Sequence, residues 1–263
     1  IIMIRESIRK GFELAWGSPM LLGLYFSASV ISGICSAFLT PNPTTAFGWF
    51  INFILFTFSL MISVFMHAGS LVYIKGKLQD GSVGFSTFIS GGRKFYKSML
   101  LLYLTIFLTF IGCVIAGCLA FLPLVLLVML AYPTILSGVL IGVGITAFTL
   151  AFLSMSFLVF SSYIIIEGNV GIFRSLRLSA ILVYDHIGQV IGLLGSAIVA
   201  SLVPVVLFGV LLFLLIDRAV VIPGYFVEEA FSLLTWFTMA FISITFLTAF
   251  MHCYLQWSKE ETV

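Results

Sequence analysis

Two uncharged stretches limit what this chain can fold into more than any other feature of its sequence. Residues 14–74 and 98–166 contain no Asp, Glu, Lys or Arg, which gives runs of 61 and 69 residues. Of all 263 residues, 62% are hydrophobic and 8% are charged, against about 25% charged in soluble domains. A soluble monomer of this length cannot cover so much apolar surface. The chain is therefore predicted to be an all-α polytopic membrane protein, which disfavours nucleic-acid binding, a disulfide scaffold and a soluble enzyme.

The uncharged runs also predict the number of spans, because a spanning helix needs about 20 residues. Two further runs, of 31 and 29 residues, hold one span each, and the two long runs hold two each. Prolines divide the long runs, at Pro41 and Pro43 in the first and at Pro123 and Pro133 in the second. The nine apolar residues from Leu124 to Tyr132 are too few to span alone, and they either extend a helix or lie in the interface. The six expected spans lie near residues 19–39, 47–74, 98–122, 134–162, 188–215 and 231–257.

The segments between the spans carry basic residues on one side of the membrane. With the N-terminus in the cytoplasm, eleven of the twelve Lys and Arg residues lie inside, and Arg218 alone lies outside. Placing three spans in residues 98–166 instead leaves nine inside and three outside, which fits the positive-inside rule less well. We therefore expect six spans with both termini in the cytoplasm.

Amphipathic helical segments precede the first, third and fifth spans. The clearest runs from Phe85 to Met99, with apolar residues on one face and basic residues on the other. We expect the three segments to lie along the inner membrane surface without crossing it. In the first and third segments, the expected apolar faces are Ile4, Ile8, Phe12, Trp16 and Ile172, Phe173, Leu176, Ala180, Tyr184. The residues expected at the interface are Trp16, Phe85, Phe88, Arg93, Lys94, Phe95, Tyr96, Lys97, Arg174, Arg177 and Tyr184.

An aromatic residue ends each amphipathic segment just before a span, at Trp16, Tyr96 and Tyr184. The chain thus reads as one integral membrane domain, residues 1–263, made of three copies of an interfacial helix plus a helical hairpin. The copies cover about residues 1–83, 84–171 and 172–263. The alternative is that any membrane protein built from hairpins repeats its basic segments in this way.

Two segments carry a resemblance to a known family. They are YIKGKLQDGSVGFSTF at residues 73–88, with GRKF at 92–95, and IIEGNVGIFRSLRLS at residues 165–179. They resemble the membrane domain attached to some bacterial glycerophosphodiester phosphodiesterases, and its stand-alone integral-membrane relatives. The phosphodiesterase chemistry of that group lies in a separate soluble domain, so the resemblance implies a membrane module without catalysis. It also implies the inner, cytoplasmic membrane of a prokaryote.

Two histidines are the candidate ligands for a cofactor. His67 and His252 each follow a Met and precede an inner Lys by eight and seven residues, which places them at matching depth. Two facing histidines can hold a b-type haem or a metal ion. The alternative, which we favour, is that each hydrogen-bonds a neighbouring helix. We therefore expect no cofactor and no metal, and we expect bound lipid.

Small residues at four-residue spacing predict close helix packing within the spans. One ladder on the fifth span is Gly188, Gly192, Ser196 and Ala200, and a shorter one on the fourth span is Gly138 and Gly142. The ladders serve either packing within the chain or docking on another subunit. For the fifth span, we expect the ladder to be buried against protein and not against lipid.

Three functions remain open from the sequence. The spans have no Asp, Glu, Lys or Arg near their middles, where such residues usually mark a transport or proton path. We therefore expect a non-catalytic accessory or scaffolding subunit, whose partners are the bilayer and other membrane subunits. The first alternative is a six-helix permease working with a separate ATPase, in which residues 85–97 form the coupling helix. The second is a haem-carrying redox subunit.

Overall fold

The computed structural model describes residues 2–38, 45–79, 81, 83–131, 136–218 and 224–260, and every element in them is an α-helix. The helices divide into two compact units, residues 1–96 with 187–263, and residues 97–186. Each unit is described by itself. In order, the helices are α1 (Ile2–Gly17), α2 (Pro19–Ala37), α3 (Ala46–Gln79), α4 (Phe85–Ala131), α5 (Leu136–Ser156), α6 (Ser161–Gly168), α7 (Ile172–Asp185), α8 (Ile187–Arg218) and α9 (Gly224–Glu260).

The chain is all-α and polytopic, as predicted. Over the described residues, four helices are long and apolar enough to cross a membrane, in α3, α4, α8 and α9. A fifth span arises if α1 and α2, which meet at an 85° bend, count as one. Six spans therefore remain a prediction. The expected breaks at Pro41, Pro43 and Pro133 lie outside the described residues.

The expected helix boundary near residue 99 is wrong. We expected residues 85–99 to form a separate interfacial helix, and residues 124–132 either to extend a helix or to lie in the interface. Instead, one helix of 47 residues runs from Phe85 to Ala131, so residues 124–131 extend the helix. No proline lies between Phe85 and Leu122, so nothing local interrupts the hydrogen bonding there. Pro123 removes one backbone bond, a loss that membrane helices tolerate.

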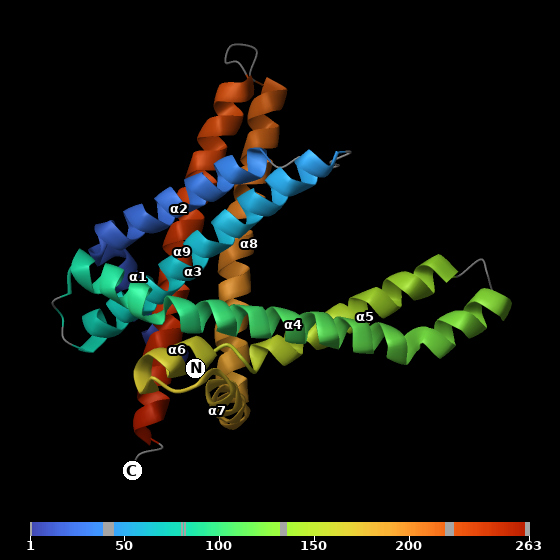
Figure 1. Cartoon of the computed structure of the whole chain (residues 1–263). Helices are drawn as coiled ribbons and strands as arrows, with labels where there is room; N and C mark the ends of the chain where they lie inside the picture. The colour runs from blue at the N-terminus through green and yellow to red at the C-terminus, as the bar shows by residue number, and fades with distance from the viewer. Residues whose placement is uncertain are drawn as a thin grey trace. The chain divides into compact units, whose positions relative to one another are not determined.

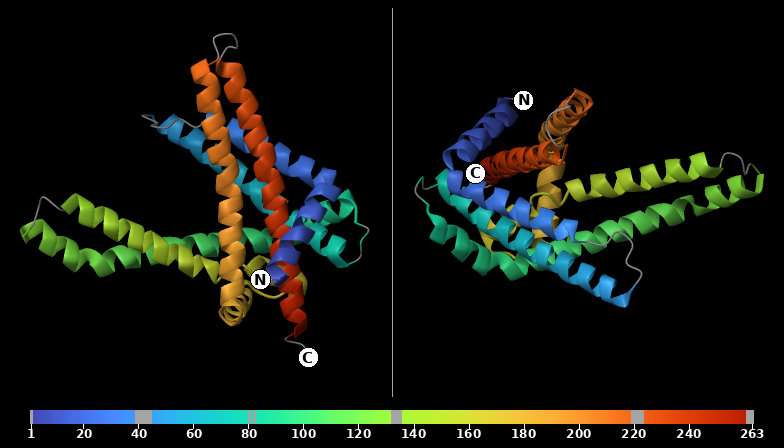
Figure 2. Two further views of the ribbon diagram at one scale, coloured as in Figure 1. Left: turned by 180° about the vertical axis from the view of Figure 1, so that it is seen from behind. Right: turned by 90° about the horizontal axis from the view of Figure 1, so that it is seen from above.

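The first unit is organised around α9. Helix α1 packs along α9 in the antiparallel direction, and α8 and α2 also pack on α9 (Figures 1 and 2). Helices α2 and α3 lie side by side as a hairpin. The aromatic pairs Phe26–Phe237 and Phe208–Phe231 join α2 and α8 to α9, with ring centroids 6.1 and 6.2 Å apart.

The second unit is a long hairpin followed by a short helical corner. The part of α4 beyond residue 96 runs beside α5 in every view (Figures 1 and 2), and a Cβ on Gly117 would lie 3.0 Å from Cβ of Ala147. The expected fourth span, residues 134–162, is interrupted after Ser156 and resumes as α6 at Ser161. Helix α7 packs against α6.

Candidate functional site

Two of the three basic segments, α1 and α7, turn a face of mostly small residues toward protein and leave their aromatic residues exposed. In α1, the buried residues are Ser7, Gly11 and Ala15. The expected apolar residues Phe12 and Trp16 are 52% and 76% exposed. The small face brings two helix backbones close together, whereas the aromatic face is left for the membrane interface. In α7, similarly, the buried residues are Ser175, Ser179, Leu182 and Val183, while Phe173 and Tyr184 are exposed.

The first of three docking contacts is the α1–α9 seam, formed by the small face of α1 and the C-terminal half of α9. Gly11 lies so close to α9 that an added Cβ would overlap the carbonyl oxygen of Thr245. Ser7 Oγ lies 2.9 Å from Nδ1 of His252, and the Cys253 thiol donates a hydrogen bond to Ser7 Oγ across 3.2 Å. Glycine at position 11 allows the approach that these polar contacts require.

The second contact is the α3–α4 seam, where glycines from both helices interlock with larger side chains. A Cβ on Gly69 of α3 would lie 2.8 Å from the carbonyl oxygen of Phe88 and 2.9 Å from its ring. In return, Gly92 of α4 faces the ring of Phe65, 2.7 Å from a built Cβ. The rings of Phe65 and Phe88 pack edge to face, 6.0 Å apart. Each helix therefore supplies both the gap and the group that fills it.

The third contact is the α6–α7 seam, which stabilises the interruption after α5. Ser179 of α7 is fully buried and serves as both acceptor and donor. Its Oγ accepts a hydrogen bond from the amide of Phe160 at 3.1 Å and donates one to the carbonyl oxygen of Phe157 at 2.9 Å. One side chain thus satisfies two backbone groups freed where the helix breaks.

The three seams follow one pattern along the chain. When the three segments are aligned on Trp16, Tyr96 and Tyr184, two positions one helical turn apart are buried in all three. The first position is Gly11, Gly91 and Ser179, and the second is Ala15, Phe95 and Val183. Each basic segment also packs on the helix that ends the preceding repeat: α4 on α3, and α7 on α6. The first basic segment, α1, packs in the same way on α9, the last helix of the third repeat. A threefold internal repeat predicts such a pattern.

The residues expected at the membrane interface divide into exposed and buried ones. Phe88 and Phe95 are buried, at 1% and 6% exposure, and therefore pack on protein. Phe85 stacks on Phe88 at 6.1 Å, with half of its surface exposed, and Lys94 Nζ lies 5.0 Å from the ring centroid of Phe95. Tyr96 is half-buried, and the exposed members are Trp16, Arg93, Lys94, Lys97, Arg174, Arg177 and Tyr184.

The candidate haem ligands occupy different surroundings. His67 is half-buried on α3. His252 has Ser7 Oγ at 2.9 Å from Nδ1 and Gln256 Nε2 at 3.4 Å from Nε2, so a ligand role would displace one of these partners. Over the described residues, no cluster of three or more His, Cys, Asp or Glu side chains is placed to hold a metal ion.

The predicted small-residue ladders make little contact within the chain. On α8, Gly192 faces Ile4 of α1, 2.8 Å from a built Cβ, whereas Gly188 has no described side chain within 4 Å. Ser196 bonds back to the carbonyl of Gly192, and Ala200 is half-buried. On α5, Gly138 and Gly142 are exposed, and no described atom lies within 4 Å of a built Cβ.

The sequence predictions of close packing concern small residues inside the spans, and they do not include the seam residues. Ser7, Gly11 and Ala15 have the same four-residue spacing within an amphipathic segment. Their signal was overlooked beside the more prominent aromatic stripe. The glycines at 69, 91 and 92 lack this regular spacing, and only the paired helix reveals their role.

Two buried hydroxyls, of Ser7 on α1 and of Thr248 on α9, should respond differently to substitution. Ser7→Ala removes the partner of His252 and Cys253, and we expect it to lower the free energy of unfolding by about 1–3 kcal/mol. Thr248→Val removes a buried hydroxyl with no hydrogen-bond partner in the described structure, so we expect no loss of stability. Denaturant titrations in mild detergent measure both changes. Equal destabilisation by the two variants would contradict the assigned hydrogen bonds.

No protein-family model, curated protein or solved structure matches this chain. Its function is therefore argued from its own geometry.

Proposed function

We propose that the chain is a non-catalytic integral membrane subunit that supports or scaffolds a larger assembly. It would lie in the inner membrane of a prokaryote with both termini in the cytoplasm. The observation that carries the proposal is how little of each span the chain itself covers. The most apolar windows of the candidate spans in α3, α4 and α8 are only 6%, 11% and 11% buried, against 39% in α9.

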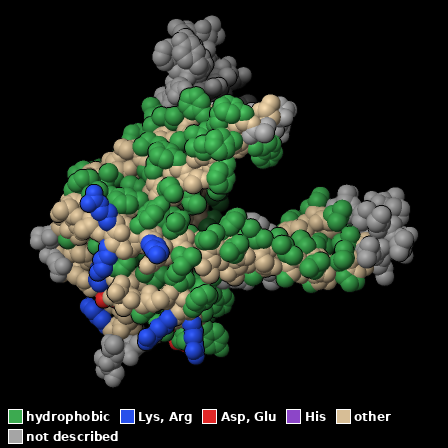
Figure 3. All heavy atoms as spheres, viewed as in Figure 1, with side chains coloured by type: hydrophobic (Ala, Val, Ile, Leu, Met, Phe, Trp, Pro, Cys, Tyr) green, Lys and Arg blue, Asp and Glu red, His purple; other side chains and the backbone are tan. Residues whose placement is uncertain are grey.

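Helices that are apolar and uncovered have two possible neighbours in a membrane, which are lipid and other proteins. Exposed hydrophobic side chains cover the far ends of α2 and α3 (Figure 3). The packing within the first unit centres on α9, which α1, α2 and α8 contact. Each unit therefore leaves long apolar faces available to partners.

The character of the spans supports a subunit over a transporter or enzyme. A charged substrate path usually carries ionisable residues at bilayer depth, and the span middles have none. The resemblance to membrane domains without catalytic residues of their own favours the same conclusion, and it too stays a prediction.

A permease working with an ATPase is the second candidate, favoured by one observation. Arg93 and Lys94 of α4 are exposed, whereas Gly91 and Gly92 on the same segment are buried. A docked segment with an exposed basic face could couple to a soluble partner. The two proposals differ in whether the spans enclose a path, and reconstituted transport with a cognate ATPase would favour the permease.

A photocrosslinking experiment in native membranes tests the proposed subunit role. A photoreactive amino acid replaces Val206, which is 59% exposed on α8, and in a control replaces Leu193, which is fully buried on the same helix. We expect the first position to yield a discrete heavier protein adduct, and the control to yield none. The complex, extracted with its lipids, should contain that partner in fixed stoichiometry by native mass spectrometry. Lipid adducts alone at Val206, with a single chain in the extracted particle, would contradict the proposal.

A further inference from the structure

An open hollow of about 290 Å³ lies beside the bend between α1 and α2. Its lining comes from the last two turns of α1, from Ser18 between α1 and α2, and from the end of α3. Its polar lining comes from Lys10, Glu13, Ser18 and Lys77, and its apolar lining includes Leu14 and Leu78. The hollow therefore combines charge with apolar walls, at the end of the α2–α3 hairpin where basic residues gather.

The two lysines of the hollow keep donors for a ligand. Lys77 Nζ donates one hydrogen bond, to the carbonyl oxygen of Gly81 at 3.0 Å. Lys10 Nζ lies 4.0 Å from a carboxylate oxygen of Glu6. Each ammonium group has three donors, so both can still bind an anion. Glu13, the acidic residue of the lining, lies 3.6 Å from Arg9 Nε, which offsets its charge.

The start of α2 adds backbone donors to the same place. Helix α2 begins at Pro19, which has no N–H, and the amide of Leu22 bonds to the carbonyl oxygen of Ser18 at 3.1 Å. The amides of Met20 and Leu21 are therefore first-turn donors without a partner inside the helix. A helix start of this kind attracts phosphate groups.

Ser18 is the second, independent sign of a ligand. Its side chain lines the hollow, and the residue is only 3% exposed. A serine before a helix usually accepts a hydrogen bond from one of the first amides. Ser18 Oγ forms no hydrogen bond in the described part of the chain. This hydroxyl is therefore available to a ligand that enters the hollow.

We propose that this hollow binds a phosphate group, held by Lys10, Lys77, Ser18 and the first amides of α2. In the membrane, this phosphate belongs to a phospholipid headgroup. Leu14 and Leu78 then lie against the less polar part of the lipid. The inference does not depend on the subunit role, because it concerns a lipid held by the chain alone.

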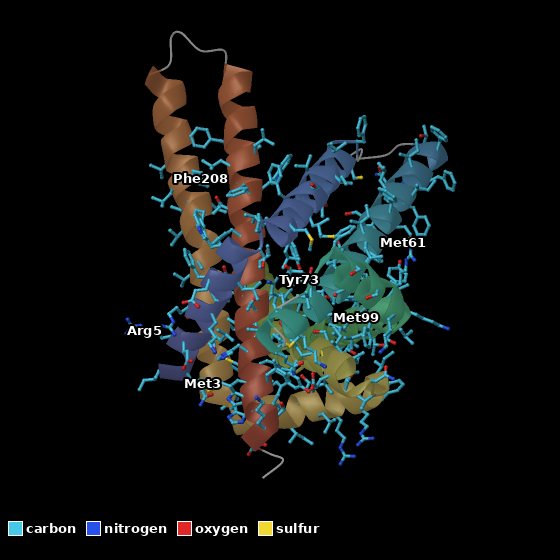
Figure 4. The ribbon with its side chains drawn as sticks, turned by 90° about the vertical axis from the view of Figure 1, so that its left-hand side faces the viewer. Met3, Arg5, Met61, Tyr73, Met99 and Phe208 are labelled. Atoms are coloured by element: carbon cyan, nitrogen blue, oxygen red, sulfur yellow. The ribbon has the colours of Figure 1, made fainter. Side chains whose placement is uncertain are left out.

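A lipid titration of the purified full chain tests the site. Phosphatidylglycerol is added to the protein in neutral detergent, and bound lipid is counted by native mass spectrometry. The test variant is K10Q/K77Q, and the matched control is R5Q/K75Q, which removes the same charge from the same two helices outside the hollow. Arg5 projects from α1 away from α9 (Figure 4) and does not line the hollow.

We expect one saturable lipid on the wild type and on the control, and at least about tenfold weaker binding by K10Q/K77Q. Equal loss in both double variants would show non-specific attraction to surface charge and overturn the site. If K10Q/K77Q does not fold, Ser18→Ala decides, because it removes only the hydroxyl. Its affinity should fall severalfold, and an unchanged affinity would overturn the proposal.

Two further arms identify the source of the phosphate. A diacyl glycolipid without phosphate should not bind, and its binding at equal affinity would overturn the phosphate assignment. Inorganic phosphate, titrated in the same detergent, should not displace the lipid at millimolar concentration. Displacement would support the phosphate site but overturn its assignment to a lipid.

Discussion

Gly11→Ala is expected to cause the largest loss of stability among Gly→Ala changes at the described glycines. The new Cβ would overlap the carbonyl oxygen of Thr245, and a backbone atom cannot turn aside as a side chain does. Helix α1 must then move away from α9, which also separates Ser7 from His252. We expect the free energy of unfolding to fall by about 3 kcal/mol, measured by denaturant titration in mild detergent.

Gly17→Ala is the matched control, because it adds the same methyl group to the same helix. No described atom lies within 4 Å of a Cβ at that position. The control should be neutral or gain up to about 1 kcal/mol from better helix propensity. If Gly11→Ala proves as stable as Gly17→Ala, then α1 does not dock on α9 as described.

Gly69→Val is the second change with a large expected effect. Its Cβ would lie 2.8 Å from the carbonyl oxygen of Phe88 and 2.9 Å from the ring, so the α3–α4 seam must open. We expect a loss of about 2–3 kcal/mol and a lower yield of folded protein. Phe88→Ala should not restore stability in the double variant, because the obstructing carbonyl oxygen remains.

Gly192→Ala on α8 is the comparison for Gly69→Val, because its added methyl group meets a side chain and not a backbone atom. Its Cβ would meet only Cδ1 of Ile4, the flexible end of a side chain, at 2.8 Å. The loss should stay below about 1 kcal/mol. A loss at Gly192 as large as that at Gly69 would contradict the difference between backbone and side-chain obstruction. Folded yield by size-exclusion chromatography and unfolding titrations measure both.

Much of the helical layout could be predicted from charge alone. The expected spans at 47–74, 188–215 and 231–257 match α3, α8 and α9 to within a few residues at most ends. Lipid solvates an uncharged run whichever helices pack beside it. The length of the run therefore predicts the length of the helix.

The break between α5 and α6 could not be predicted in the same way. Residues 157–160 read Phe-Leu-Val-Phe, with no glycine or proline. The break is stabilised by Ser179, 19 residues beyond Phe160. Conversely, α4 continues through Pro123, one of the two outcomes that the sequence left open. Local sequence carries neither the contact that holds a break nor the surroundings that tolerate a proline.

The face that each basic segment turns toward protein also depends on residues far away in the sequence. Periodicity correctly indicated that residues 4–16 are amphipathic, but it could not decide which side meets protein. That choice depends on residues more than two hundred positions away. The backbone of Thr245 comes close to Gly11, and the ring of His252 comes close to Ser7. Matching depth likewise suggested His67 and His252 as a pair, whereas the partner of His252 on α1 had no sequence signal.

Cysteine accessibility in intact cells tests the central claim most directly, namely that the basic segments lie on the cytoplasmic side of a six-span protein. Single cysteines are placed at Ser90 and Arg174, both exposed on basic segments, in a chain free of its own cysteines. Three more are placed at Thr45, Thr134 and Ile222, between the members of each hairpin. We predict that a membrane-impermeant thiol reagent labels the last three from outside and labels Ser90 and Arg174 only after permeabilisation. Labelling of Ser90 and Arg174 from opposite sides would contradict the account.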